Sequence, residues 1–161
     1  MTVLLSTCLV GINTQWDGGS CRKSDLVELV RSGRAVFLCP EQLGGLTTPR
    51  APAEIEPGRT AREVLAGEAK VLTDAGQDVT EQFVSGAQEV LALCQEIGIN
   101  VAVLKATSPS CGSSETYDGT FTLTLRPGRG ITTELLALNG IKVYNEENYP
   151  DWIAVQEQPA K

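Results

Sequence analysis

Residues 101–112 read VAVLKATSPSCG, a stretch that shows most directly which class of fold to expect. Its four apolar residues, rich in β-branched valine, are typical of a short strand that is buried on both faces. A loop of hydroxyl and turn residues follows at once and carries Cys111. A buried strand that runs into such a loop is the repeating unit of parallel α/β sheets.

The same unit occurs twice earlier in the chain. Residues 2–7 (TVLLST) form an apolar run before Cys8, and residues 35–38 (AVFL) run into Cys39. In an open parallel sheet all strands point the same way, and ligands bind outside their carboxyl ends. We therefore expect three cysteines that are far apart in sequence to meet at one edge of the sheet, although chance could also place cysteines at strand ends.

Helices are expected between the strands. Apolar residues recur at helical spacing within residues 23–32 and along residues 80–97, for which Thr80 is the expected N-cap. Cys94 lies on the apolar stripe of the second helix, which favours a buried structural role for this thiol. The remaining expected elements are helices over residues 60–70 and 132–138, strands over residues 120–125 and 141–144, and a peripheral tail beyond Asn148.

The order of these elements predicts the fold class. Short apolar strands that alternate with helices form βαβ units, whose crossovers place helices on both faces of a parallel sheet. With 161 residues the chain is close to the commonest size of one domain. We therefore expect a single domain over residues 1–161, a three-layer α/β structure of the Rossmann-like kind with a mainly parallel sheet.

The charge of the chain argues against long nucleic acid as a partner. Its formal net charge is −7 and its longest basic run is Arg22-Lys23, whereas proteins that bind RNA or DNA show a basic face. No apolar run approaches the roughly 20 residues that span a bilayer, and the first residues lack the basic region and cleavage site of a signal peptide. We expect a cytoplasmic protein without membrane contact.

Five cysteines and no histidine are the informative part of the composition. The cytoplasm keeps thiols reduced, and an odd number of cysteines does not complete a disulfide framework. The absence of histidine removes the commonest zinc ligand and the usual general base. Any metal must therefore depend on thiolates. Cys21, in a glycine-rich loop, fits either an ordinary surface thiol or a ligand.

The residues beside two of the strand-end cysteines are unusual. Glu41 places a carboxylate next to Cys39 at the end of a buried strand, where a charge needs a partner or a function. Ser108 and Ser110 surround Cys111 with hydroxyl groups in a tight turn. Loops of this kind direct main-chain N–H groups and hydroxyls at an anion or at cluster sulfurs.

Five segments also carry a resemblance to a known family. They are residues 6–11 (STCLVG), 16–19 (WDGG), 39–50 (CPEQLGGLTTPR), 108–112 (SPSCG) and 117–121 (YDGTF). In this order they resemble the bacterial iron–sulfur thiouracil desulfidases, long labelled only as a domain of unknown function. The resemblance covers nearly the whole chain and is highly specific for the family, but less so for one substrate within it.

The resemblance implies a cofactor and a reaction. The family holds a 4Fe–4S cluster on three cysteines and leaves the fourth iron free for substrate, and Cys8, Cys39 and Cys111 match its motif cysteines. Its members remove sulfur from thiolated uracil or its nucleotide, giving the oxygen analogue and hydrosulfide without net redox change. Cys21 stands where the family often has a basic or polar residue, so its role stays open.

Within this family reading, roles follow for two residues. A thiocarbonyl bound to iron is open to attack by water, and Glu41 is the leading candidate to deprotonate that water because the chain has no histidine. Its structural alternative is to cap a nearby loop or helix. Ser108 is a candidate to hydrogen-bond the pyrimidine edge or to pass a proton, and its alternative is a turn residue before Pro109.

Four further residues are candidates to bind a substrate phosphate. They are Ser20, Arg22, Arg50 and Lys105, each of which could instead be a surface group or part of an internal salt bridge. Asp17 and Asp118, each followed by glycine, are most simply turn formers that could also position a ribose.

The expected substrate is a small thiolated pyrimidine, thiouracil or 4-thiouridine monophosphate. The basic residues favour the nucleotide, and the net charge counts against thiolated transfer RNA. The enzymatic alternative is another hydrolase- or lyase-type reaction on an open cluster iron. The alternative without catalysis is a redox or metal sensor in which a cluster or zinc only stabilises the fold.

Overall fold

A four-stranded parallel sheet forms the centre of the protein in the computed structural model, which describes residues 1–156. The strand order is β2-β1-β5-β8, so the first strand of the chain is internal. Leu4 of β1 pairs with Val36 of β2 on one side and with Ala102 of β5 on the other. The strands are β1 (Val3–Ser6), β2 (Ala35–Leu38), β5 (Val101–Leu104) and β8 (Lys142–Asn145).

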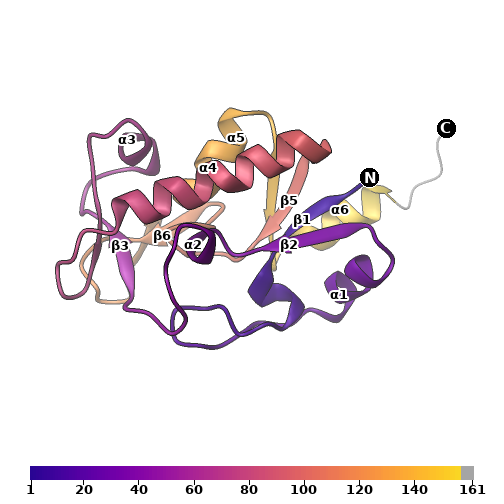
Figure 1. The fold of residues 1–161 in the computed structure, drawn as a ribbon, viewed down its shortest axis with the longest axis horizontal. Helices are drawn as coiled ribbons and strands as arrows, with labels where there is room; N and C mark the ends of the chain where they lie inside the picture. The colour runs from indigo at the N-terminus through magenta and orange to yellow at the C-terminus, as the bar shows by residue number, and fades with distance from the viewer. Residues whose placement is uncertain (157–161) are drawn as a thin grey trace.

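Helices cover both faces of this sheet, as Figure 1 shows. Because side chains alternate along a strand, Leu5 of β1 packs under α1 and α6, whereas Leu4 packs against α4 and α5. The prediction of a three-layer α/β domain with a parallel sheet is confirmed. The helices are α1 (Ser24–Arg31) and α6 (Tyr149–Gln156) on one face, and α2 (Pro40–Leu43), α4 (Thr80–Ile97) and α5 (Ile131–Leu138) on the other.

The expectation of a peripheral tail beyond Asn148 is wrong for α6, which belongs to the core, and residues 157–161 lie outside the described residues. Tyr149 and Trp152 are buried against residues of β1 and α1. The Tyr149 hydroxyl donates a 2.6 Å hydrogen bond to the carboxylate of Asp25 on α1. The two aromatic side chains of this short segment supply the apolar surface that buries it.

A second, smaller layer was not expected. The strands β3 (Ala53–Ile55) and β4 (Val71–Thr73) pair antiparallel and share a separate apolar cluster with α3 (Ala61–Leu65). The helix predicted over residues 60–70 is therefore shorter than expected. Thr60 and Glu63 begin it with a reciprocal capping box.

Thr80 is not the N-cap of α4. It is the first residue of that helix, after Val79, and its hydroxyl accepts a 2.9 Å hydrogen bond from the N–H of Val71. The carboxylate of Asp78 instead accepts from both the N–H and the hydroxyl of Thr80. The N-cap position is held by Val79, which makes no side-chain cap bond, so the expected cap was misplaced by one position.

The strand expected over residues 120–125 is a turn. The hairpin strands are β6 (Glu115–Tyr117) and β7 (Leu125–Pro127), and residues 118–124 connect them. Phe121 and Leu123 have positive φ angles of 57° and 60°, which no strand accommodates. No helix within residues 1–156 is long and apolar enough to cross a membrane.

Candidate metal centre

The carboxyl ends of three adjacent strands surround one cavity. Cys8 lies in the short 3₁₀ helix η1 (Thr7–Val10) directly after β1, Cys39 directly follows β2, and Cys111 lies in the loop after β5. All three line the same cavity of about 320 Å³, which we call the strand-end cavity. The structure thus brings together the three cysteines that were selected by their place after strands that run in one direction.

The loop that carries Cys111 is held by many main-chain hydrogen bonds. The first residues of α5 direct their N–H groups at it: Ile131 donates to the carbonyl of Pro109, and Thr132 to that of Ser110. The Thr133 hydroxyl donates a 2.8 Å bond to the carbonyl of Cys111. The position of this thiol is therefore fixed by the fold.

Burial raises the pKa values of the three thiols. The pKa of Cys8 rises to about 11, partly opposed by a hydrogen bond from Gln15, and that of Cys111 rises to about 12. Burial also raises the pKa of Cys39. All five cysteines of the chain are free thiols. The three cavity thiols carry protons at neutral pH until a metal group displaces them.

The other two cysteines do not line the strand-end cavity. Cys94 is fully buried in the apolar cluster between α4 and the sheet, as its position on the apolar stripe of the helix predicted. Cys21 is half-buried beside the cluster under α1, and its N–H donates to the carbonyl of Cys8. Cys21 therefore supports the backbone beside a cavity thiol through its main chain.

Glu41 and Arg50 form an ion pair in the wall of the cavity. Their side chains are 14% and 6% exposed, and Arg50 Nη2 lies 3.4 Å from Glu41 Oε2. Burial raises the pKa of Glu41, and the guanidinium of Arg50 opposes this effect. Glu41 thus has a charged partner instead of the capping role that was its structural alternative.

Arg50 has no N–H group left for a substrate phosphate. Its Nε and Nη2 contact Glu41, while Nη2 also donates 2.9 Å to the carbonyl of Thr14. Its Nη1 donates to the carbonyl of Thr47 and to the hydroxyl of Thr48. Arg50 is therefore part of an internal salt bridge, which was the alternative to a role in phosphate binding. Its side chain connects three segments of the protein beside the cavity.

Ser108 lies at the cavity with a defined orientation. Its Oγ accepts hydrogen bonds from the N–H of Cys111 at 2.7 Å and of Ser110 at 3.1 Å. Ser108 therefore stabilises the turn, as its structural alternative predicted, but these bonds use only the lone pairs of its oxygen. The hydroxyl proton of Ser108 stays available to a group in the cavity.

Lys105 lines the cavity and is paired with Glu146. The two side chains are 28% and 9% exposed, and the ammonium donates to the Glu146 carboxylate and to the carbonyl of Ala106. Burial lowers the pKa of Lys105, but the hydrogen bond and charge of Glu146 outweigh it and raise that pKa overall. Lys105 is thus a cation with one N–H left for a ligand.

Ser20 and Arg22 are outside the cavity. Both are exposed, and the methylene groups of Arg22 lie over Gly11. Asp17 and Asp118 accept hydrogen bonds from the N–H groups two residues further on, as turn formers do. These four residues do not line the strand-end cavity.

Sequence reasoning missed several polar residues of the cavity wall, among them Glu54 and Ser6. The buried carboxylate of Glu54 accepts from the N–H groups of Gly119 and Phe121, and so holds the hairpin turn against β3. The buried hydroxyl of Ser6 contacts Cys111. Ser6 stood in the quoted motif beside Cys8, whereas Glu54 had no local signal because its partners are 65 and 67 residues away.

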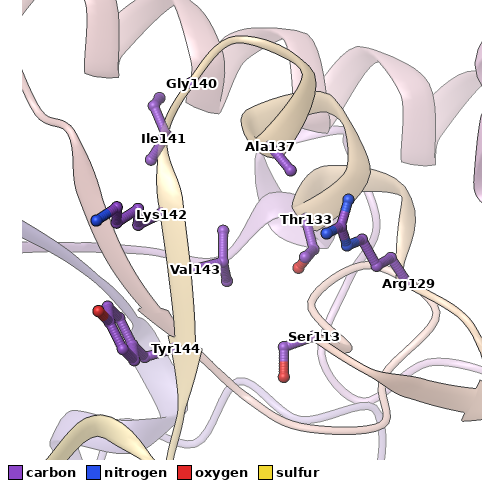
Figure 2. A pocket seen from close by; sticks show the side chains of 9 residues that line it. All are labelled: Ser113, Arg129, Thr133, Ala137, Gly140, Ile141, Lys142, Val143 and Tyr144. Atoms are coloured by element: carbon purple, nitrogen blue, oxygen red, sulfur yellow. The ribbon is translucent and has the colours of Figure 1, made fainter. Parts of the chain in front are cut away.

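A second cavity of about 400 Å³ lies between α5 and the edge strand β8. Figure 2 shows Val143 pointing from β8 toward α5, whereas Lys142 and Tyr144 point to the opposite side. The residues that line this cavity include neither cysteine nor carboxylate. Within residues 1–156, no three His, Cys, Asp or Glu side chains form a group that could hold a single metal ion.

Comparisons with known proteins found a family model, a relative and a solved structure that are similar to this chain over most of its length. A family model described as 2-thiouracil desulfurase matches residues 3–148. The uncharacterized protein YbbK of Bacillus subtilis (strain 168) is 43% identical over 149 residues, which are 92% of this chain and 98% of YbbK. The solved structure of the [4Fe–4S]-dependent thiouracil desulfidase TudS matches with a TM-score of 0.85 and 40% identity, over 96% of this chain and 97% of that one.

Proposed function

The chain belongs to the 2-thiouracil desulfurase family, and on this basis we propose that it removes sulfur from a thiolated pyrimidine with a [4Fe–4S] cluster held by Cys8, Cys39 and Cys111. The observation that carries the proposal is that these three thiols and the carboxylate of Glu41 line one cavity. The other two cysteines lie outside it.

The donor set fits an iron–sulfur cluster. Three cysteine sulfurs come from three separate segments, and the chain has no histidine to complete a zinc site. The three thiols line one cavity, so these cysteines would be the residues that hold such a cluster. With three cysteine ligands, one iron is left for substrate. A reducing compartment such as the cytoplasm would keep these thiols available.

The reaction exchanges sulfur for oxygen without redox change. The C=S bond of the pyrimidine is replaced by C=O, water supplies the oxygen, and the sulfur leaves as hydrosulfide with one proton of that water, while the other proton is released. When bound, the cluster supplies a thiophilic iron that acts as a Lewis acid toward the thiocarbonyl sulfur. The protein must therefore bind the ring, activate a water and move its protons.

Glu41 is the group that activates the water. Its two contacts with Arg50 are 3.4 and 3.5 Å long, so the carboxylate keeps lone pairs for a water in the cavity. Arg50 has its other N–H groups bound to the protein, and it therefore holds Glu41 in place. A carboxylate positioned in this way serves as general base in the absence of histidine.

Ser108 and Lys105 bind the substrate. The free hydroxyl proton of Ser108 is placed to hydrogen-bond the ring edge or to relay a proton. Lys105 is the remaining cation of the wall with an unused N–H, and it suits the phosphate of 4-thiouridine monophosphate or the departing hydrosulfide. Ser20 and Arg22 have no part in this site, since they do not line the cavity.

The experiment is an anaerobic activity assay. The protein is purified without oxygen, its iron content and visible spectrum are recorded, and 2-thiouracil, 4-thiouracil or 4-thiouridine monophosphate is added. We expect loss of thiocarbonyl absorbance together with release of hydrosulfide. A protein that binds iron on these cysteines but converts none of the three compounds would contradict the proposal and favour a sensor. Relative rates would show whether base or nucleotide is preferred.

A further inference from the structure

We propose that Ser6 is a positioning residue that hydrogen-bonds the sulfur of Cys111 and thereby tunes the bound cluster. The inference rests on the proposed function, because it takes Cys111 as a cluster ligand. It concerns a hydroxyl of the cavity wall that acts through the sulfur of Cys111. Its contact joins residues 105 positions apart in sequence.

The contact has a defined direction. The Ser6 hydroxyl is buried, with 3% of the residue exposed, and its oxygen lies 3.6 Å from Cys111 Sγ. The same oxygen accepts a 2.9 Å hydrogen bond from the N–H of Lys105. A hydroxyl has one proton, and an N–H cannot accept it, so the proton points to the sulfur. A thiolate ligand is a better acceptor for this proton than the thiol.

The sheet holds Ser6 in this orientation. Ser6 is the last residue of β1, and Lys105 directly follows β5, the strand that pairs with β1. The bond from Lys105 to the Ser6 oxygen therefore lies just beyond the β1–β5 ladder. A donor fixed by a sheet needs no rearrangement when the cluster binds.

A hydrogen bond to a ligand sulfur changes the cluster. It draws electron density from the thiolate, which favours the reduced state and raises the reduction potential. The same withdrawal leaves the irons more acidic toward a thiocarbonyl sulfur. Ser6 therefore supports both retention of the cluster and its chemistry.

The two serines that precede Cys111 in its loop, Ser108 and Ser110, do not make this contact. The Ser110 hydroxyl is fully buried and bonds to Thr132 at 2.9 Å, and the Ser108 oxygen faces main-chain N–H groups. Ser110→Ala is thus a matched control, because it also removes a buried hydroxyl beside Cys111 but leaves the Ser6 contact in place.

The test compares Ser6→Ala, Ser6→Thr and Ser110→Ala with the wild type after anaerobic loading. Three quantities are measured: the reduction potential of the cluster, the rate of iron loss to a chelator, and kcat. We expect Ser6→Ala to lower the potential, to lose iron roughly tenfold faster and to lower kcat by a similar factor. Ser6→Thr keeps the hydroxyl and should stay near the wild-type potential, as should Ser110→Ala.

Several outcomes would overturn the inference. If Ser6→Ala kept the reduction potential and the rate of iron loss of the wild type, Ser6 would serve only as an acceptor for the Lys105 N–H. Equal effects of Ser110→Ala would make the change a general packing effect. If Ser6→Ala does not fold, Ser6→Thr decides, and a changed potential despite its hydroxyl would refute the proposal. A wild type that holds no cluster contradicts the proposed function instead.

Discussion

Gly86 of α4 lies directly on the carbonyl oxygen of Pro40 at the start of α2, and a Cβ at Gly86 would stand only 1.9 Å from that oxygen. The contact is repeated one turn away, where a Cβ at Gly44 would stand 1.8 Å from the carbonyl of Gln82. The two helix backbones therefore touch, and this fixes α2, which carries Glu41 and directly follows Cys39.

Gly86→Ala is expected to displace α2. Alanine is the better helix former, but here its methyl group would overlap a carbonyl that cannot rotate away, and overpacking of this kind costs about 3 kcal/mol. We expect a lower free energy of unfolding and loss of bound iron and turnover, measured by denaturation and iron content. Ser85→Ala, at the neighbouring position of α4, is the control. A Gly86→Ala protein with normal iron content would show that α2 does not position Cys39.

The cysteine assignments predict two classes of variant. Cys8→Ala, Cys39→Ala and Cys111→Ala should each lose the cluster spectrum and turnover while the protein stays folded. Cys94→Ala should keep the cluster and lose about 1 kcal/mol of stability, because it leaves a small cavity in the core between α4 and the sheet. Iron analysis and thermal unfolding of the four proteins separate the classes. Loss of iron binding in Cys94→Ala alone would refute the assignment.

The ion pair between Glu41 and Arg50 predicts that a substitution of Glu41 mainly affects turnover, whereas a substitution of Arg50 mainly affects stability. Glu41→Gln should keep the cluster and the fold but lose turnover by a factor of at least about 100, as expected when a general base is removed. Turnover retained in this variant would remove Glu41 from the mechanism.

Arg50→Ala should mainly destabilise. It leaves the carboxylate of Glu41 buried without a partner and frees the carbonyl of Thr14, and breaking a buried pair in this way costs about 3–5 kcal/mol. Denaturation of the single and double variants checks this. Adding Glu41→Gln to Arg50→Ala should restore part of the stability, because no buried charge then remains. A double variant less stable than Arg50→Ala would contradict the expectation.

The strand-end cysteines could be predicted because their signal is local. An apolar run followed at once by a cysteine identifies a strand and its carboxyl end, and parallel strands bring these ends to one edge. Nothing beyond residues 2–8, 35–39 and 101–111 was needed to place three thiols around one cavity. The helical periodicity of residues 80–97 identified Cys94 as a core residue in the same way.

The partners of the charged residues could not be predicted, because they depend on contacts between distant segments. Arg50 meets Thr14, 36 residues earlier, and Lys105 meets Glu146, 41 residues later. A charged residue in a sequence does not show whether it is free or paired, so the three basic phosphate candidates could not be told apart. The structure leaves only Lys105 at the cavity with an N–H to offer.

The bond between Tyr149 and Asp25 predicts how stability depends on pH at the alkaline end. Burial and the Asp25 carboxylate raise the pKa of Tyr149 to about 12, above its unfolded value of about 10. A raised pKa means that the folded state holds the proton more tightly, so the contribution is complete below pH 10 and is lost as the pH rises toward 12. Tyr149→Phe should cost about 2 kcal/mol at pH 8, a loss that shrinks over this window. Urea unfolding of both proteins at several pH values measures it. Tyr144→Phe is the control, because the Tyr144 hydroxyl has no hydrogen-bond partner within residues 1–156. A loss of stability in Tyr149→Phe that stayed constant up to pH 12 would contradict the assignment of this bond to Tyr149 and Asp25.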